Sequence, residues 1–102
     1  MPKVVDFQPC DRWTWQAYRD AISADLVLQH AVMSKVEQLP SCKALFEAKM
    51  ARWTVERNRG CKRNSDKAYG GASLEPMAMS LCMAHEAEQM TKQVERQRAC
   101  KR

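Results

Sequence analysis

Five cysteines and two histidines are the residues of this 102-residue chain whose side chains could bind a metal or attack a substrate. Successive cysteines are 32, 19, 21 and 18 residues apart and no CxxC pair occurs, which argues against a zinc finger or a thioredoxin-like centre. His85 follows Cys82 by one helical turn, a spacing that suits a two-point metal ligand or an activated thiol. Cys61 would add a third ligand, but no fourth is evident. We therefore predict no metal site.

The other polar residues do not suggest catalysis. His30 has no carboxylate or nucleophile at a relay spacing. Gly70 and Gly71 lack the preceding strand and the following lysine of a phosphate-binding loop. The acids of the C-terminal third are interspersed with basic residues, as in surface ion pairs on a helix: Glu86, Glu88, Lys92, Glu95, Arg96 and Arg98. We predict that the chain is not an enzyme and needs no cofactor.

The cysteines are better explained as disulfide partners. In two antiparallel helices, residues at the same height have numbers whose sum is nearly constant. The numbers of Cys61 and Cys82 sum to 143 and those of Cys42 and Cys100 to 142, so both pairs fit one register. The two bridges would pin the ends of a helical hairpin, roughly 28 Å apart at about 1.5 Å per residue. Helical rotation fits Cys42 and Cys61 less well, unless Cys61 lies beyond the end of its helix.

Cys10 is left over, and three alternatives are open for it. It is free, it links two chains, or it replaces one of the assigned partners, since it should lie near the loop end of the hairpin. Five cysteines in so small a chain favour an exported domain. The sequence contains no signal peptide and no apolar run long enough to span a bilayer. We expect a periplasmic or secreted protein whose export signal has been removed, with a cytoplasmic protein as the alternative.

Apolar residues at steps of three and four predict helices throughout. The first helix should begin with Asp11 as its cap and stop before Pro40, with Ser41 capping the next. Its apolar stripe comprises Ala17, Ala21, Ala24, Leu28, Ala31 or Val32, Val36 and Leu39. Trp13, Trp15 and Tyr18 are expected to pack against the end of the bundle rather than to bind a ligand.

A second helix over residues 42–59 should be closed by Gly60 and followed by a basic loop that turns at Gly70 and Gly71. A third helix should follow, with Ser73 as its cap and Pro76 in its first turn. Its apolar positions, Met79, Met83, Ala87, Met90 and Val94, are expected to form core rather than a methionine-lined binding groove.

These elements predict an all-α fold, a three-helix up-down-up bundle that contains a disulfide-stapled helical hairpin. Residues 1–10 would form an extended N-terminal segment and residues 11–100 a single helical domain, as the length allows. The net charge of +5 is uneven: residues 1–39 carry four Lys/Arg and five acids, whereas residues 40–102 carry 13 and seven. The basic part is either an ordinary solvated surface or a site for an anionic partner.

The middle of the chain resembles the LprI-type lysozyme-inhibitor domain of small exported bacterial proteins. The resemblance covers roughly residues 42–94 and rests on the spacing of Phe46, Trp53, Arg57, Cys61, Gly71, Ser73, Pro76 and Cys82. It implies that Cys61 and Cys82 bridge two helices, and that the protein is a helical module of the cell envelope. Met50, Ala87 and Met90 stand where the family has Gln, Thr and Arg, so we expect no copy of that polar network.

The function expected from these features is binding to a partner protein in the cell envelope. The resemblance implies a lysozyme-like or other wall-degrading enzyme as the target, with inhibition of that enzyme or immunity to it as the outcome. The alternative is a basic module for an anionic polymer, either a cell-wall polymer or a nucleic acid. Under either interpretation the candidate binding surface comprises Arg57, Arg59, Lys62, Arg63, Lys67 and Tyr69.

Overall fold

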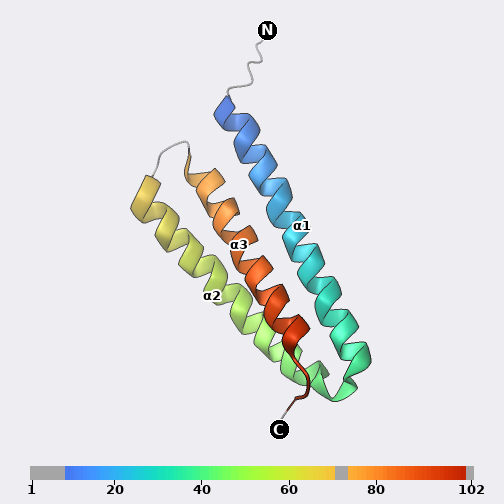
Figure 1. Ribbon diagram of the computed structural model, residues 1–102. Helices are drawn as coiled ribbons and strands as arrows, with labels where there is room; N and C mark the ends of the chain where they lie inside the picture. The colour runs from blue at the N-terminus through green and yellow to red at the C-terminus, as the bar shows by residue number, and fades with distance from the viewer. Residues whose placement is uncertain (1–8, 71–73, 101–102) are drawn as a thin grey trace.

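The computed structural model describes residues 9–70 and 74–100, and the side chains of residues 15–68, 70 and 74–100. It consists of three long helices, α1 (Pro9–Gln38), α2 (Lys43–Tyr69) and α3 (Glu75–Arg96), and a 3₁₀ turn, η1 (Pro40–Cys42) (Figure 1). The all-α fold is confirmed, because the described residues include no strand. None of the described helices combines the length and the apolarity needed to cross a membrane.

The helices run down, up and down in the view of Figure 1, so that α1 and α3 are parallel and α2 is antiparallel to both. A hydrogen bond between the C-terminal ends of α1 and α3 agrees with their parallel alignment. Lys35 Nζ of α1 donates it to the carbonyl oxygen of Glu95 on α3, at 3.0 Å. Both α1 and α2 pack mainly on α3 and contact each other sparsely. The third helix is therefore the centre of the bundle, with the other two along its sides.

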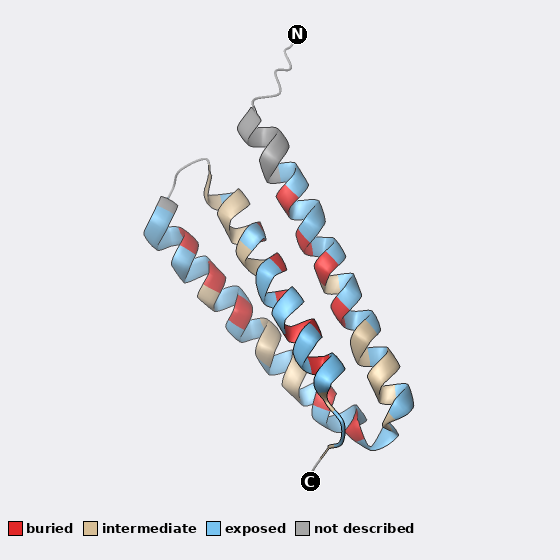
Figure 2. Cartoon of the chain, in the orientation of Figure 1, coloured by how far each residue is buried: buried red, intermediate tan, exposed pale blue. Residues whose placement is uncertain are grey.

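The core lies along the faces that α1 and α2 turn toward α3 (Figure 2). The predicted stripe of α1 is confirmed in Ala17, Ala21, Ala24 and Leu28, which are all buried. Met90 and Val94 of α3 are also buried, while Met79 and Met83 are half-buried, so the methionine-containing stripe faces the core as predicted. Phe46 of α2 is fully buried. It is the largest such side chain of the described residues.

The helix ends depart from the prediction in several places. The first helix begins at Pro9, before Asp11, and ends at Gln38 as Pro40 requires. Ser41 lies inside η1, and Cys42 occupies the cap position of α2 without a side-chain cap bond. Leu74 occupies the corresponding position of α3, with Pro76 in the first turn as predicted. Gly71 and Ser73 lie outside the described residues.

The predicted basic loop is instead helix. The second helix continues through Gly60 to Tyr69, about ten residues beyond the expected end. An interior glycine costs only about 1 kcal/mol, and Lys62, Arg63, Lys67 and Ala68 beyond it are good helix formers. Lys62 and Asp66, at i and i+4, form an ion pair of 2.7 Å across that extension and support it. Gly60 is thus tolerated inside the helix and does not close it.

Both predicted disulfides are present. Cys61 joins Cys82 with their Cα atoms 5.7 Å apart, and Cys42 joins Cys100 with theirs 5.4 Å apart. The suggested reason for the poorer rotational fit was wrong. Cys61 is inside α2, whereas Cys42 lies in η1 and Cys100 beyond the end of α3, where ideal helical rotation does not apply. The side chain of Cys10 lies outside the described residues.

Removing either disulfide should destabilise the bundle, and the bridge that closes the longer segment should contribute more. In the chain-entropy description, a bridge over a separation of 21 residues contributes about 3 kcal/mol and one over 58 residues about 4 kcal/mol. We expect Cys42→Ala/Cys100→Ala to lower the free energy of unfolding in urea more than Cys61→Ala/Cys82→Ala does. Cys10→Ala serves as the control. A larger loss from the shorter segment would contradict the entropic explanation.

Candidate binding groove between α1 and α2

Arg57 of α2 forms the polar contact that joins all three helices. Its guanidinium makes two hydrogen bonds to the carboxylate of Asp25 on α1, at 2.6 and 3.3 Å. The same group lies 3.5 Å from the carbonyl oxygen of Met83 on α3, and its Nε donates to Asn58 at 3.1 Å. The guanidinium also lies over the ring of Trp53, 4.6 Å from the centroid. A two-pronged contact of this kind needs the planar fork of an arginine.

The burial of Arg57 corrects its assignment to the binding surface. Its side chain is only 4% exposed, compared with 38% for that of Asp25. A buried guanidinium is stable only when its charge is compensated, and Asp25 provides that compensation. No buried side-chain nitrogen or oxygen among the described residues lacks a hydrogen-bond partner. Arg57 therefore holds the helices together and is not available to an anionic ligand.

An apolar groove of about 690 Å³ runs between α1 and α2, from the Asp25–Arg57 contact toward η1. It exists because the two helices pack on α3 rather than on each other. Its apolar lining consists of Leu28, Val32, Met33, Val36, Phe46, Met50, Ala51 and Trp53. A concave apolar site with a few polar groups at its edge is the usual form of a binding pocket. The sequence analysis assigned several of these residues to core and did not predict the groove.

The charges around the groove differ in sign from the net charge of the chain. Asp25 and Arg57 neutralise each other at one end. At the other end lie Glu37, Glu47 and Lys43, which are all exposed. The five charged groups of the lining therefore have a net charge of −1. The groove is thus apolar in its floor and weakly acidic at its rim, although residues 40–102 together are strongly basic.

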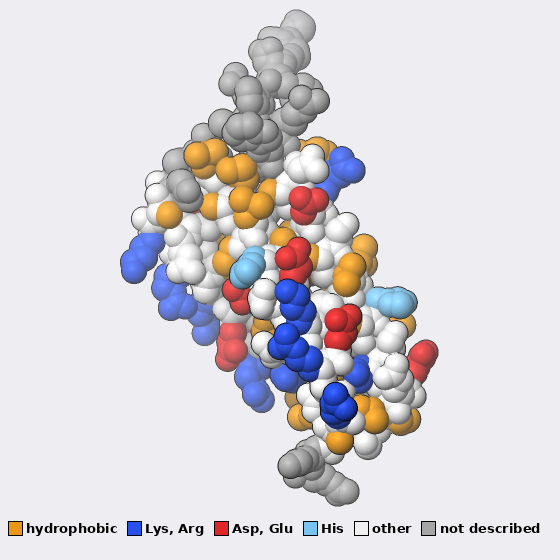
Figure 3. All heavy atoms as spheres, viewed as in Figure 1, with side chains coloured by type: hydrophobic (Ala, Val, Ile, Leu, Met, Phe, Trp, Pro, Cys, Tyr) orange, Lys and Arg blue, Asp and Glu red, His pale blue; other side chains and the backbone are white. Residues whose placement is uncertain are grey.

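The rest of the predicted basic surface divides into two parts. Arg59, Arg63 and Lys67 are exposed at steps of four along the outer face of α2, where Figure 3 shows basic side chains following the edge of the molecule. Lys62 instead pairs with Asp66 and with Glu75 of α3, at 2.7 and 3.3 Å. Hydrogen bonds to Asp66 and then to Glu75 raise the pKa of Lys62 above its usual value. The side chain of Tyr69 lies outside the described residues.

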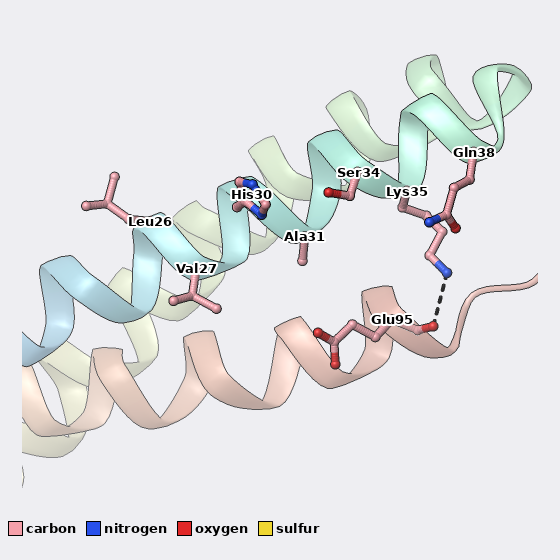
Figure 4. Close-up of a pocket in the computed structure, with 8 residues that line it drawn as sticks. All are labelled: Leu26, Val27, His30, Ala31, Ser34, Lys35, Gln38 and Glu95. Atoms are coloured by element: carbon pink, nitrogen blue, oxygen red, sulfur yellow. Dashed lines mark hydrogen bonds between the residues drawn. The ribbon is translucent and has the colours of Figure 1, made fainter.

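A second, shallower pocket of about 490 Å³ lies on the opposite side of α1, against α3. In Figure 4 the side chain of Lys35 reaches the backbone of Glu95, while Leu26 points away from α3. His30 also lines this pocket, together with Ser34. No interaction among the described residues links His30 to Ser34 or to a carboxylate, so the pocket contains no assembled catalytic relay.

The cysteine–histidine pair of α3 is not arranged as a metal site. Cys82 is bonded to Cys61, so its sulfur cannot act as a thiolate ligand beside His85. Within residues 9–70 and 74–100, no group of three or more His, Cys, Asp or Glu residues is placed to hold a metal ion. The binding groove is accordingly the feature of the described structure best suited to a ligand.

Comparison of the chain with models of protein families, with curated proteins and with solved structures finds no match. The residues that carry the resemblance can nonetheless be located. Phe46 is buried, Trp53 supports the guanidinium of Arg57, and Pro76 is exposed in the first turn of α3. The sequence analysis missed Asp25 as the partner of Arg57, because 32 residues separate the two positions.

Disrupting the Asp25–Arg57 contact should show strong energetic coupling. Asp25→Asn leaves a buried guanidinium without a counter-charge and Arg57→Met removes the guanidinium, whereas the double variant leaves neither charge unpaired. We expect the two single losses to sum to about 1–3 kcal/mol more than the loss in the double variant, a range lowered by the partial exposure of Asp25. Urea unfolding measures all three, with the exposed Asp20→Asn as control. Additive losses would mean that the contact contributes nothing.

Proposed function

We propose that this chain is a non-enzymatic binding protein of the bacterial cell envelope, related to the LprI-type lysozyme inhibitors. In this proposal a wall-degrading enzyme, lysozyme-like in charge, docks on the groove between α1 and α2. The observation that carries the proposal is the apolar groove itself, left open in a bundle whose α2 and α3 are pinned by two disulfides. The wall of the groove on α2 belongs to this cross-linked hairpin, so that wall loses little conformational entropy when a partner binds.

The rim of the groove gives the preferred chemistry of the partner. Animal-type lysozymes are strongly basic, so the net positive charge of residues 40–102 by itself argues against them as partners. The local charges favour such an enzyme, because Glu37 and Glu47 outnumber Lys43 beside the apolar lining and Arg57 is neutralised by Asp25, which leaves a net charge of −1. Electrostatic complementarity acts over the contact surface, since charges beyond roughly 8–10 Å are screened at physiological salt. The site therefore suits an apolar side chain that is flanked by basic residues.

The disulfides also bear on the cellular compartment of the protein. Two disulfides in a small helical domain suit an oxidising environment such as the periplasm or the extracellular space. The bridge between Cys61 and Cys82 is the one that the resemblance implies, and Trp53 and Arg57 share one face as the resemblance requires. Together these features support an exported binding protein, with the groove as its active surface.

We expect the protein to slow lysis in a lysozyme turbidity assay at micromolar concentration. Ala51→Arg, which places a bulky cation in the groove, should weaken inhibition at least about tenfold, because it excludes an apolar side chain worth about 1.5–3 kcal/mol. Ala48→Arg is the matched control, since Ala48 is an exposed alanine of the same helix that does not line the groove. If the wild-type protein has no effect at micromolar concentration, inhibition of lysozyme is ruled out. Equal losses from both variants would rule out the groove as its site.

A second candidate function rests on the outer face of α2. Arg59, Arg63 and Lys67 are exposed there in one line, and no described carboxylate pairs with them. Such a line can follow the phosphates or carboxylates of an anionic polymer, and binding of that kind weakens steeply as salt rises.

Charge reversal separates the two functions. Arg63→Glu/Lys67→Glu should abolish binding to an anionic polymer such as heparin or single-stranded DNA, because two attractive contacts become repulsive. We expect the same variant to leave inhibition of lysozyme within about threefold of wild type, since these residues lie outside the groove. Titration of both activities from low to high salt measures the difference. A large loss of inhibition in this variant would favour the basic face over the groove.

A further inference from the structure

Helix α1 carries a second apolar face, which points away from the bundle. Trp15, Tyr18, Ile22, Leu26 and Met33 follow each other at steps of three, four, four and seven residues and are 46–63% exposed. On an ideal helix these five residues lie within about 80° of one another and roughly 140° from the buried alanine face. We call this set the outer stripe. The rings of Trp15 and Tyr18 stack within it, with centroids 5.8 Å apart.

Over residues 15–26 of α1, the sizes of the side chains are inverted relative to those of an ordinary surface helix. The face toward α3 uses Ala17, Ala21 and Ala24, which are 3–8% exposed, whereas large apolar side chains occupy the solvent face. A surface helix normally buries its large apolar residues and exposes polar ones. Scattered exposed apolar residues need no explanation, but four at steps of three and four that include two aromatics, with Met33 two turns further on, do. The outer stripe has the composition of a surface that is covered in the functional protein.

The area of the outer stripe matches what a small symmetric dimer requires. Large apolar side chains have areas of about 150–250 Å², so five that are about half exposed present on the order of 500 Å². Two copies would then bury roughly 1,000 Å² of apolar surface, before counting the polar residues at the edges. This reaches the lower limit for a specific protein–protein interface.

The distribution of charge favours a second copy approaching through α1. Among its described side chains, α1 carries Arg19 and Lys35 against Asp20, Asp25 and Glu37, close to neutrality. Lys35 and Asp25 are engaged with α3 and α2. The rest of the chain, residues 40–102, carries 13 Lys/Arg and seven acids, so contact through α2 or α3 would bring two basic surfaces together. Pairing through α1 keeps those surfaces on opposite sides of the assembly.

We infer that the protein forms a two-fold symmetric dimer in which the outer stripe of one copy packs on the outer stripe of the other. A two-fold axis uses the same patch twice, so a self-complementary apolar stripe is sufficient and no further partner is needed. The stacked Trp15 and Tyr18 supply the aromatic contacts that are enriched at the centres of such interfaces. The outer stripe and the binding groove share Met33 at their edges, but Ile22 and Leu26 at the centre of the stripe do not line the groove, so the inference is tested separately from the proposed function.

Sedimentation equilibrium over about 1–200 µM tests the dimer, with Cys10→Ala in every sample to exclude chance cross-links between chains. The Cys10→Ala parent protein should associate with a dissociation constant in the micromolar range. Leu26→Glu should weaken association at least about tenfold, because it places a charge in the buried stripe. Leu26 is 58% exposed in the single chain, so the variant should fold normally, as circular dichroism would show.

Val55→Glu is the matched control, because Val55 is 53% exposed on the far side of α2. It should associate like the parent protein. A monomer at every concentration, or equal weakening by Leu26→Glu and Val55→Glu, would overturn the inference. The remaining alternative is that a membrane covers the outer stripe. The dimer would also be overturned if the protein stays monomeric, sediments with phosphatidylglycerol–phosphatidylethanolamine vesicles and loses that binding in Leu26→Glu.

Discussion

The contact between Asp25 and Arg57 is the interaction on which the shape of this bundle depends. Two hydrogen bonds in this contact join α1 directly to α2, whereas both helices otherwise pack mainly on α3. Arg57 reaches across the space between the helices and is held there by Trp53 and by the backbone of Met83. A long polar side chain thus spans α1 and α2 at one end of the groove, whose two walls otherwise meet mainly through α3.

The two walls of the groove differ in how they are held. Helices α2 and α3 are cross-linked near both ends, so that wall is fixed by covalent bonds. Among the described side chains, α1 is joined to the hairpin by packing and hydrogen bonds alone. Its buried alanines offer little apolar area, at about 0.8 kcal/mol for each buried methylene-sized group. Leu28 and the half-buried Val32 and Val36 therefore supply most of the apolar packing of α1, and the polar contacts of Asp25 and Lys35 add to it.

Sequence patterns were sufficient to predict the helical class, the core stripes and both disulfides, because each depends on spacing along one or two helices. They failed where the result depended on competition between local signals. Gly60 suggested a helix end, but the helix formers after it and the Lys62–Asp66 pair outweighed the cost of one glycine. They also failed where residues from distant segments meet. The pairing of Asp25 with Arg57, and the groove that it borders, depend on the angle between two helices, which apolar periodicity does not encode.

The position of Arg57 also explains why net charge was a poor guide to the binding surface. Six positive charges in excess over residues 40–102 suggested a basic site, yet the charge of Arg57 is compensated and that of Lys62 is paired with acids. The exposed Arg59 and Arg63 lie on the outer face of α2, away from the groove. Buried or paired charges contribute little to the field that a partner meets, whereas two glutamates at the rim contribute directly. In the proposed function the partner is therefore selected by the few local charges at the groove, Glu37, Lys43 and Glu47, rather than by the excess of arginine and lysine elsewhere.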